Sequence, residues 1–144
     1  MLINLSNHPY AIWSNEQKCS AQVYGSIIDL PFPYIDPAGD EGYIQSLCDE
    51  YLQKIDAICK DDTCDASTIT VHIMGEMTFT LSMINVLQNR GIICIASTTE
   101  RVTKVENGVK SSEFRFVNFR KYSNNGKRCH QFHAKSATSI GATE

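Results

Sequence analysis

The sequence predicts an α/β fold: a mostly parallel sheet with helices on both faces and a C-terminal β-hairpin. Strand-like runs alternate three times with helical patterns, which is typical of a layered α/β domain. The strand-like runs are almost continuously apolar, as in sheets that are buried on both faces. An Asn-Gly dipeptide between two alternating runs predicts the hairpin.

The first two predicted elements are a buried strand and a capped helix. Residues 2–5 (LINL) form a short apolar run that ends at a turn-prone segment. Ser14 is followed three residues later by Gln17, the arrangement of a capping box. Gly25 suits the position after a helix, so we expect a helix over 14–24.

The next pair is a strand over 26–30 and a long helix over 40–60. Between them, three prolines force an extended connection, because proline fixes φ and keeps the preceding residue out of the helical region. Apolar residues in 40–60 recur at helical spacing, which predicts an amphipathic helix packed on the sheet.

Residues 68–74 (TITVHIM) predict a third strand, and a helix over 76–89 should follow and end at Gly91. His72 lies inside that strand, and we interpret it as an interior histidine with satisfied hydrogen bonds. Residues 92–98 (IICIAST) predict the fourth strand. The hairpin then turns at Asn107–Gly108.

Together these elements predict a single Rossmann-like domain over residues 1–122, with right-handed crossovers. The segment 123–144 is polar and rich in small residues, so we expect a mobile tail. No G-x-G-x-x-G motif follows a strand, which argues against a dinucleotide-dependent oxidoreductase. We expect no cofactor.

Cysteine usage and hydropathy favour a cytoplasmic protein. The six cysteines are irregularly spaced, which indicates reduced thiols rather than a disulfide framework. Cys129, His130 and His133 form half of a zinc site without visible partners, so we expect no metal. No apolar run reaches the length of about 18 residues that a membrane span needs, and the N-terminus has no signal-peptide pattern.

Charge is divided unevenly along the chain. The net charge of −3 argues against binding of long nucleic acids. Residues 1–100 hold 4 Lys/Arg and 13 Asp/Glu, a balance of −9, whereas residues 101–144 hold 9 and 3, a balance of +6. The basic part could attract an anionic ligand, contact a protein partner, or lie against the acidic helices.

Polar segments follow the predicted strands, and ligands of open α/β sheets bind beyond the carboxyl ends of strands. After the third strand, Gly75 allows a tight turn into a helix whose first amides form an anion seat. Glu76 and Thr78 could contribute to that seat, or could serve only the start of the helix.

Three further segments complete the predicted site, and one of them is PFPYIDP (31–37), which follows the second strand. Three hydroxyls and an arginine, whose planar fork of donors suits phosphate oxygens, follow the fourth strand, at Ser97, Thr98, Thr99 and Arg101. A polar turn follows the first strand, at Ser6, Asn7 and His8. His8 could act as an acid or base near neutral pH, or could be a solvated surface group.

In order along the chain, the segments NLSNHPYAIWSNEQ, YGSIIDLPFPYIDP, VHIMGEMTFT, GIICIASTTER and FRFVNFRKY resemble a known family. They are similar to small standalone CRISPR-associated proteins of type III systems, which are related to CARF (CRISPR-associated Rossmann fold) domains. The resemblance covers residues 1–122. It is one of ordered segments and contains no catalytic motif that can be placed residue by residue.

The resemblance implies a cytoplasmic homodimer that binds a cyclic oligoadenylate second messenger. Members of this group are thought to sequester the messenger or to open its ring. The implied ligand-facing positions are Ser6, Asn7, His8, Gly75, Glu76, Thr78 and Ser97–Arg101. Ring opening needs only an aligned 2′-hydroxyl and stabilised phosphorane charge, for which Arg101 and His8 are the catalytic candidates. An adaptor that binds a protein partner through its basic hairpin is the alternative, and a small metal-dependent hydrolase is a third hypothesis.

Overall fold

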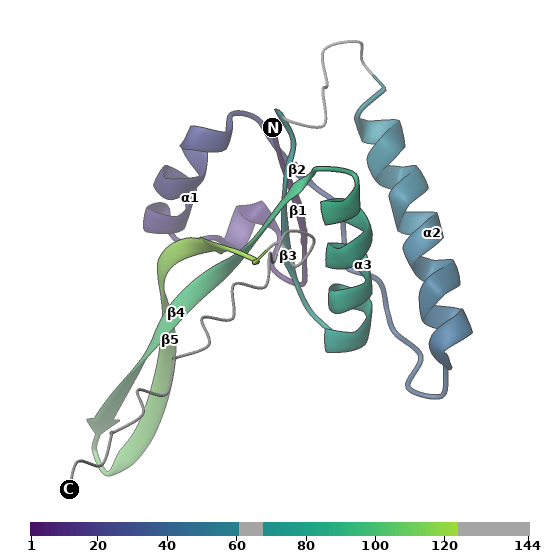
Figure 1. Ribbon diagram of the computed structural model, residues 1–144. Helices are drawn as coiled ribbons and strands as arrows, with labels where there is room; N and C mark the ends of the chain where they lie inside the picture. Colours follow the sequence, from purple (N-terminus) through teal and green to yellow (C-terminus); the bar gives the residue numbers. More distant parts are fainter. Residues whose placement is uncertain (61–67, 124–144) are drawn as a thin grey trace, which may run out of the picture.

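A five-stranded sheet with strand order β2-β1-β3-β4-β5 forms the centre of the computed structural model (Figure 1), which describes residues 1–60 and 68–123. The first four strands are parallel, and β5 pairs antiparallel with β4. Their bounds are β1 Leu2–Ser6, β2 Ile27–Asp29, β3 Thr70–Met74, β4 Ile93–Glu106 and β5 Val109–Lys121. The predicted α/β fold with a C-terminal hairpin is confirmed.

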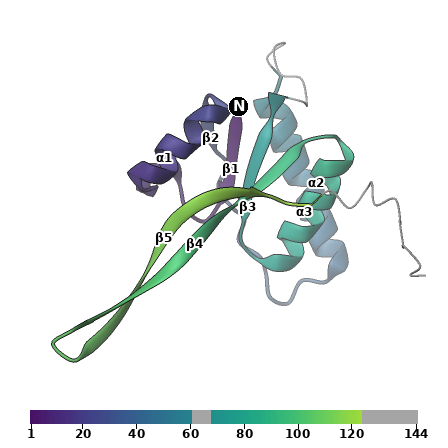
Figure 2. The same ribbon diagram turned by 60° about the vertical axis from the view of Figure 1, so that its left-hand side comes forward.

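Helices cover both faces of the sheet (Figures 1 and 2). The helix α1 (Asn15–Ala21) lies on one face, and α2 (Glu41–Ile58) and α3 (Met77–Asn89) lie together on the other. Short 3-10 helices, η1 (Tyr10–Ile12) and η2 (Gln22–Tyr24), flank α1, so the last turn of the predicted first helix is 3-10 rather than α. Ser14 lies directly before α1 and Gly25 directly after η2, as the sequence predicts.

Half of the predicted capping box forms: the Ser14 hydroxyl accepts a hydrogen bond from the Gln17 backbone amide, but the Gln17 side chain donates to Ser97 rather than bonding back to Ser14. Gly25 ends the following turn with a φ of 83°, a conformation that favours glycine. These local signals therefore determine where α1 begins and where the turn after it ends.

Alternation along the strands separates two cores. On β1, Ile3 and Leu5 join the large cluster beneath α2 and α3, whereas Leu2 joins Trp13 and Ile95 beneath α1. The α1 face also receives the buried polar residues of β1 and β3, which are Asn4, Ser6, Thr70 and His72. Buried polar groups need hydrogen-bond partners, and the partners of Asn4, Ser6 and His72 form the candidate functional site.

The β4–β5 hairpin extends beyond the rest of the sheet (Figures 1 and 2). Its turn has φ values of 51° at Asn107 and 77° at Gly108, as a type I′ turn requires. The register shifts once between Thr98 and Thr99, where an irregularity re-aims the strand. Residues 97–101 pair with β5, so they lie within β4 and not in a loop after it.

Gly75 serves a different purpose from the one that the sequence predicts. Its φ is not positive; instead, a Cβ placed on Gly75 would overlap the ring of Phe32. Phe32 packs edge-to-face on Phe79, which is fully buried at the start of α3. The glycine thus admits an aromatic ring between the β3–α3 turn and the β2–α2 connection.

We expect Gly75→Ala to lower the free energy of unfolding by about 1–3 kcal/mol, the usual cost of overpacking. Urea denaturation would measure the change. Gly42→Ala is the matched control, because a Cβ there meets only the Asp40 carboxylate at 3.4 Å and the position is helical. That substitution should be neutral or stabilising. Equal losses in both variants would contradict this account.

Candidate functional site

After β1 the chain continues to β2 on one side of the sheet, whereas after β3 it continues to β4 on the other side. The connection after β1 runs through α1 on one face, and that after β3 runs through α3 on the other. The chain therefore separates at the carboxyl ends of these two strands, which is where ligands bind in open α/β sheets. A cavity of about 280 Å³ lies there, which we call the switch-point cavity. Its wall includes Ser6, His8, Gln17, His72, Met74, Ser97, Thr99, Phe114 and Phe116.

Four residues of the predicted site line the switch-point cavity: Ser6, His8, Ser97 and Thr99. They come from the end of β1, the turn that follows it and alternate positions of β4. Asn7 and Thr98 are not in its wall, and the Thr98 hydroxyl instead donates to the carbonyl of Asn118 at 3.0 Å.

Arg101 is not in the wall of the cavity but lies beside Phe114, which is part of that wall. Its cross-strand partner is Phe114, and the guanidinium lies 5.9 Å from the centre of that ring. Cross-strand partners share one face of a sheet, so Arg101 extends over the same face that carries Thr99 and Phe116. A cation is therefore held beside the aromatic wall.

Glu76 and Thr78 lie elsewhere. The Glu76 carboxylate is the N-cap of α3 and accepts hydrogen bonds from the amides of Thr78 and Phe79 at 3.1 and 2.9 Å. These bonds, with one from the Thr78 hydroxyl, lower the pKa of Glu76. The helix amides that were predicted as an anion seat are thus already bonded to the chain's own carboxylate.

The cavity beside Glu76 is also acidic, because Asp36, Asp40 and Glu41 share its wall. Like charge disfavours an anion there. The four predicted segments therefore do not form one site: the segments after β1 and in β4 meet at the switch-point cavity, and those after β2 and β3 meet in this acidic cavity.

His72 forms the floor of the switch-point cavity and is 2% exposed. Its Nδ1 lies 2.9 Å from Oδ1 of Asn4, and its Nε2 lies 2.8 Å from Oγ of Ser97. The prediction of an interior histidine with satisfied hydrogen bonds is confirmed. The bond to Ser97 connects this histidine to the open cavity.

Asn4 fixes the orientation of His72. Its Nδ2 donates to the carbonyl of His8 at 2.9 Å and to a carboxylate oxygen of Asp29 at 2.7 Å. Because both of these groups are acceptors, the amide cannot be flipped, and Oδ1 must face His72 and the Ser6 hydroxyl. His72 therefore carries its proton on Nδ1, and Nε2 accepts from Ser97.

The pKa of His72 falls from 6.5 to about 4, mainly because the side chain is buried and to a smaller extent because of repulsion from the charged form of His8. The neutral imidazole is consequently the stable form near pH 7. Aromatic rings complete the enclosure, since Trp13 and Phe119 contact the imidazole edge-to-face at 5.3 and 5.5 Å between ring centres. The site thus holds an unprotonated nitrogen aimed at a hydroxyl.

Sequence reasoning missed Asn4, Gln17 and Asp29 and underestimated His72. One signal was available: Asn4 and His72 each interrupt an apolar run of a strand, and polar residues at such positions need a partner. The partnership itself depends on strand order, because Asn4 and His72 become neighbours only when β1 pairs with β3.

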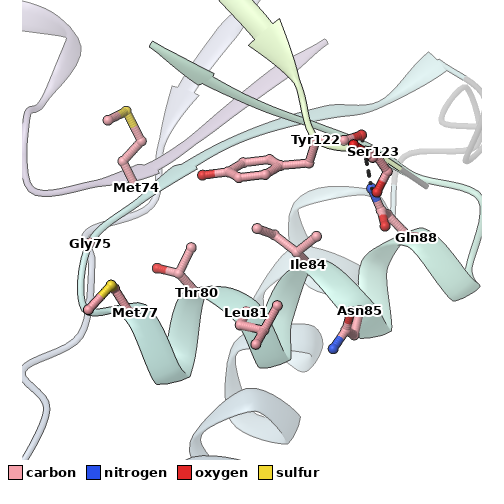
Figure 3. Close-up of a pocket in the computed structure, with 10 residues that line it drawn as sticks. All are labelled: Met74, Gly75, Met77, Thr80, Leu81, Ile84, Asn85, Gln88, Tyr122 and Ser123. Carbon is pink, nitrogen blue, oxygen red and sulfur yellow. Dashed lines mark hydrogen bonds between the residues drawn. The ribbon is translucent and has the colours of Figure 1, made fainter. Parts of the chain in front are cut away.

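A second cavity, of about 440 Å³, lies between α3 and the end of β5 (Figure 3). In Figure 3 the Tyr122 ring lies across from Thr80 and Ile84 of α3, and its hydroxyl donates to the carbonyl of Ile73 at 3.0 Å. The exposed side chains of Met77 and Leu81 make its outer wall apolar. It brings together no acid–base pair comparable to that at the switch point.

Within residues 1–60 and 68–123, no group of three or more side chains could hold a metal ion. Cys129, His130 and His133 lie outside the described residues, as does most of the predicted tail, 124–144. Among the helices that the structure describes, none is long and apolar enough to cross a membrane.

One protein family matches most of the chain. The profile of one family, described as Uncharacterized protein MJ1673 family, matches residues 1–120. The chain belongs to the MJ1673 family. The match spans the whole sheet except the last residue of β5, so the switch-point cavity lies inside the MJ1673 family region. No curated protein and no solved structure matches the chain.

Proposed function

We propose that this MJ1673 family protein binds a cyclic oligoadenylate second messenger in type III CRISPR antiviral defence. The switch-point cavity carries the proposal, because it joins hydroxyls, a histidine and aromatic rings at the edge where α/β sheets bind ligands. The segment resemblance described above supplies the identity of the ligand. Ring opening by the 2′-hydroxyl, without a metal, belongs to the same proposal.

The cavity wall suits one nucleotide. Phe116 is half-buried and Phe114 is 67% exposed, so both rings can stack on a base. Thr99 offers a hydroxyl donor for sugar and phosphate oxygens. Arg101, whose guanidinium lies beside the Phe114 ring, supplies the positive charge that a phosphodiester needs.

The homodimer is part of the same proposal, and the small volume of the cavity supports it. A cavity of about 280 Å³ is at the lower end of the range for small-molecule sites. It takes one nucleotide unit rather than a whole ring. A cyclic tetra-adenylate has repeating units, so a two-fold homodimer would present two such cavities to opposite units of one ring. His8 remains a candidate proton donor, and Arg101 a candidate for stabilising charge on the phosphorane.

Titration of the protein with cyclic tetra-adenylate and with cyclic hexa-adenylate, followed by calorimetry, tests the proposal. We expect Phe116→Ala to weaken binding by about 5-fold or more, the loss that accompanies removal of one stacking platform. Thr99→Val should also weaken binding. Thr98→Val is its matched control, because Thr98 is not in the cavity wall, and it should bind as the wild type does.

Absence of binding by either ring, with a folded protein, would overturn the proposal. Equal weakening in Thr98→Val and Thr99→Val would show that the ligand lies outside the switch-point cavity. Binding without a linear product would leave sequestration as the function.

The projecting hairpin favours a second candidate, an adaptor that binds a protein partner. Val105, Val109 and Val117 are more than half exposed on it. Lys110 and Arg120 add positive charge to the same hairpin. Charge reversal at these two positions should abolish partner capture and leave nucleotide binding intact if this candidate holds.

A further inference from the structure

Four side chains from four parts of the chain form a continuous hydrogen-bonded series beneath the switch-point cavity. Asp29 at the end of β2 accepts from Asn4 in β1, and Asn4 accepts from Nδ1 of His72 in β3. Nε2 of His72 accepts from the Ser97 hydroxyl in β4. The series runs across the sheet from the exposed Asp29 to the cavity.

The donors and acceptors at Ser97 determine in which direction a proton can move along the series. Ser97 has one proton, which its bond to Nε2 of His72 uses, and two lone pairs. One lone pair accepts from Nε2 of Gln17 at 3.1 Å. The other is left for a hydroxyl group in the cavity, whose wall Ser97 forms. Ser97 can thus carry a proton from the ligand to the base His72, and Asn4 orients that base. This is the order of groups that acid–base catalysis requires.

We propose that Ser97 and His72 form a proton relay that accepts the proton of the attacking 2′-hydroxyl, with Asn4 and Asp29 as positioning residues. The inference rests on the proposed function, because it names the general base for ring opening in the same cavity. Asp29 polarises the Asn4 amide so that its oxygen stabilises positive charge on the imidazole.

The 2′-hydroxyl gives its proton to Oγ of Ser97 while Ser97 gives its own proton to Nε2 of His72. The 2′-oxygen forms a bond to phosphorus, and the bond from phosphorus to the 5′-oxygen breaks. The leaving 5′-oxygen takes a proton from solvent in the open cavity, which leaves a 2′,3′-cyclic phosphate and a 5′-hydroxyl. His72 then releases its proton to solvent through Ser97.

Three variants separate the relay from folding and binding. Ser97→Ala removes the proton carrier, and Ser97→Thr retains a hydroxyl. His72→Gln retains an acceptor for Ser97 but is not a base. With cyclic tetra-adenylate and cyclic hexa-adenylate as substrates, we expect Ser97→Ala and His72→Gln to slow ring opening by about 100-fold or more, the range of general-base catalysis. In both variants the loss of ring opening should exceed any loss of binding, because neither variant removes the aromatic wall or Arg101.

A structural measurement accompanies the kinetics and needs no ligand. Nitrogen-15 NMR of the imidazole of His72 should show the proton on Nδ1, and the Nε2 resonance should shift in Ser97→Ala but not in Ser97→Thr. A proton on Nε2 would overturn the relay, because Ser97 could not then donate to the histidine.

The outcomes separate the two proposals. If the folded wild type binds neither ring, the proposed function fails and the relay fails with it. If the wild type binds but opens neither ring, or if Ser97→Ala opens the ring at the wild-type rate, the relay alone is overturned. Retained activity in Ser97→Thr together with its loss in Ser97→Ala supports the relay.

Discussion

Asn4→Leu should lower the free energy of unfolding by about 3–5 kcal/mol, the range for breaking a buried polar network. Asn4 is 1% exposed and bonds to Asp29, Ser6, His72 and the carbonyl of His8. Leucine has a similar size but satisfies none of these groups. Each buried group that loses its partner costs about 1–3 kcal/mol. The loss should therefore exceed that of most single substitutions.

Chemical denaturation of both proteins at pH 7 would measure the change. Asn85→Leu is the matched control, because Asn85 is an exposed residue on α3. Exposed substitutions usually change stability by less than about 0.5 kcal/mol. A loss below about 1 kcal/mol for Asn4→Leu would mean that water replaces the lost partners and that the network is not a rigid base for the cavity.

The sequence carried enough information for the elements and the sheet. Apolar runs placed the strands, Ser14 and Asp40 cap the first two helices, and Asn107–Gly108 closes the hairpin. These are local signals, and each is determined by residues within a few positions of one another. The hairpin's effect on 97–101 was less visible, because those residues become a strand only when β5 pairs with them.

The candidate site depended on contacts that local patterns do not encode. Asn4 and His72 are 68 positions apart, and Gln17 and Ser97 are 80 apart. Only the strand order brings them together. Glu76 illustrates the opposite case: its position before α3 allowed both a ligand contact and a helix cap, and the structure shows its carboxylate on the helix amides.

Acidification from pH 6.5 to pH 4 should lower the free energy of unfolding by about 3 kcal/mol through His72 alone. Burial lowers the pKa of His72 from 6.5 to about 4, with a smaller contribution from the charge of His8. In this window the unfolded chain binds a proton that the folded protein does not, so stability falls as the pH falls. Asp29, the other charged group near the imidazole, lies beyond Asn4.

Urea denaturation at a series of pH values between 7 and 4 would measure this dependence. His72→Gln should have a flatter profile between about pH 6.5 and 4.5, whereas His8→Gln should keep most of the wild-type slope, because burial, the main cause of the lowered pKa of His72, remains. Carboxylates with a lowered pKa, such as Glu76, lose their contribution only below their ordinary pKa of 4.5, so they do not obscure the window. Equal slopes in wild type and His72→Gln would mean that the folded protein accepts a proton at His72, and the neutral base at the floor of the cavity would then be lost.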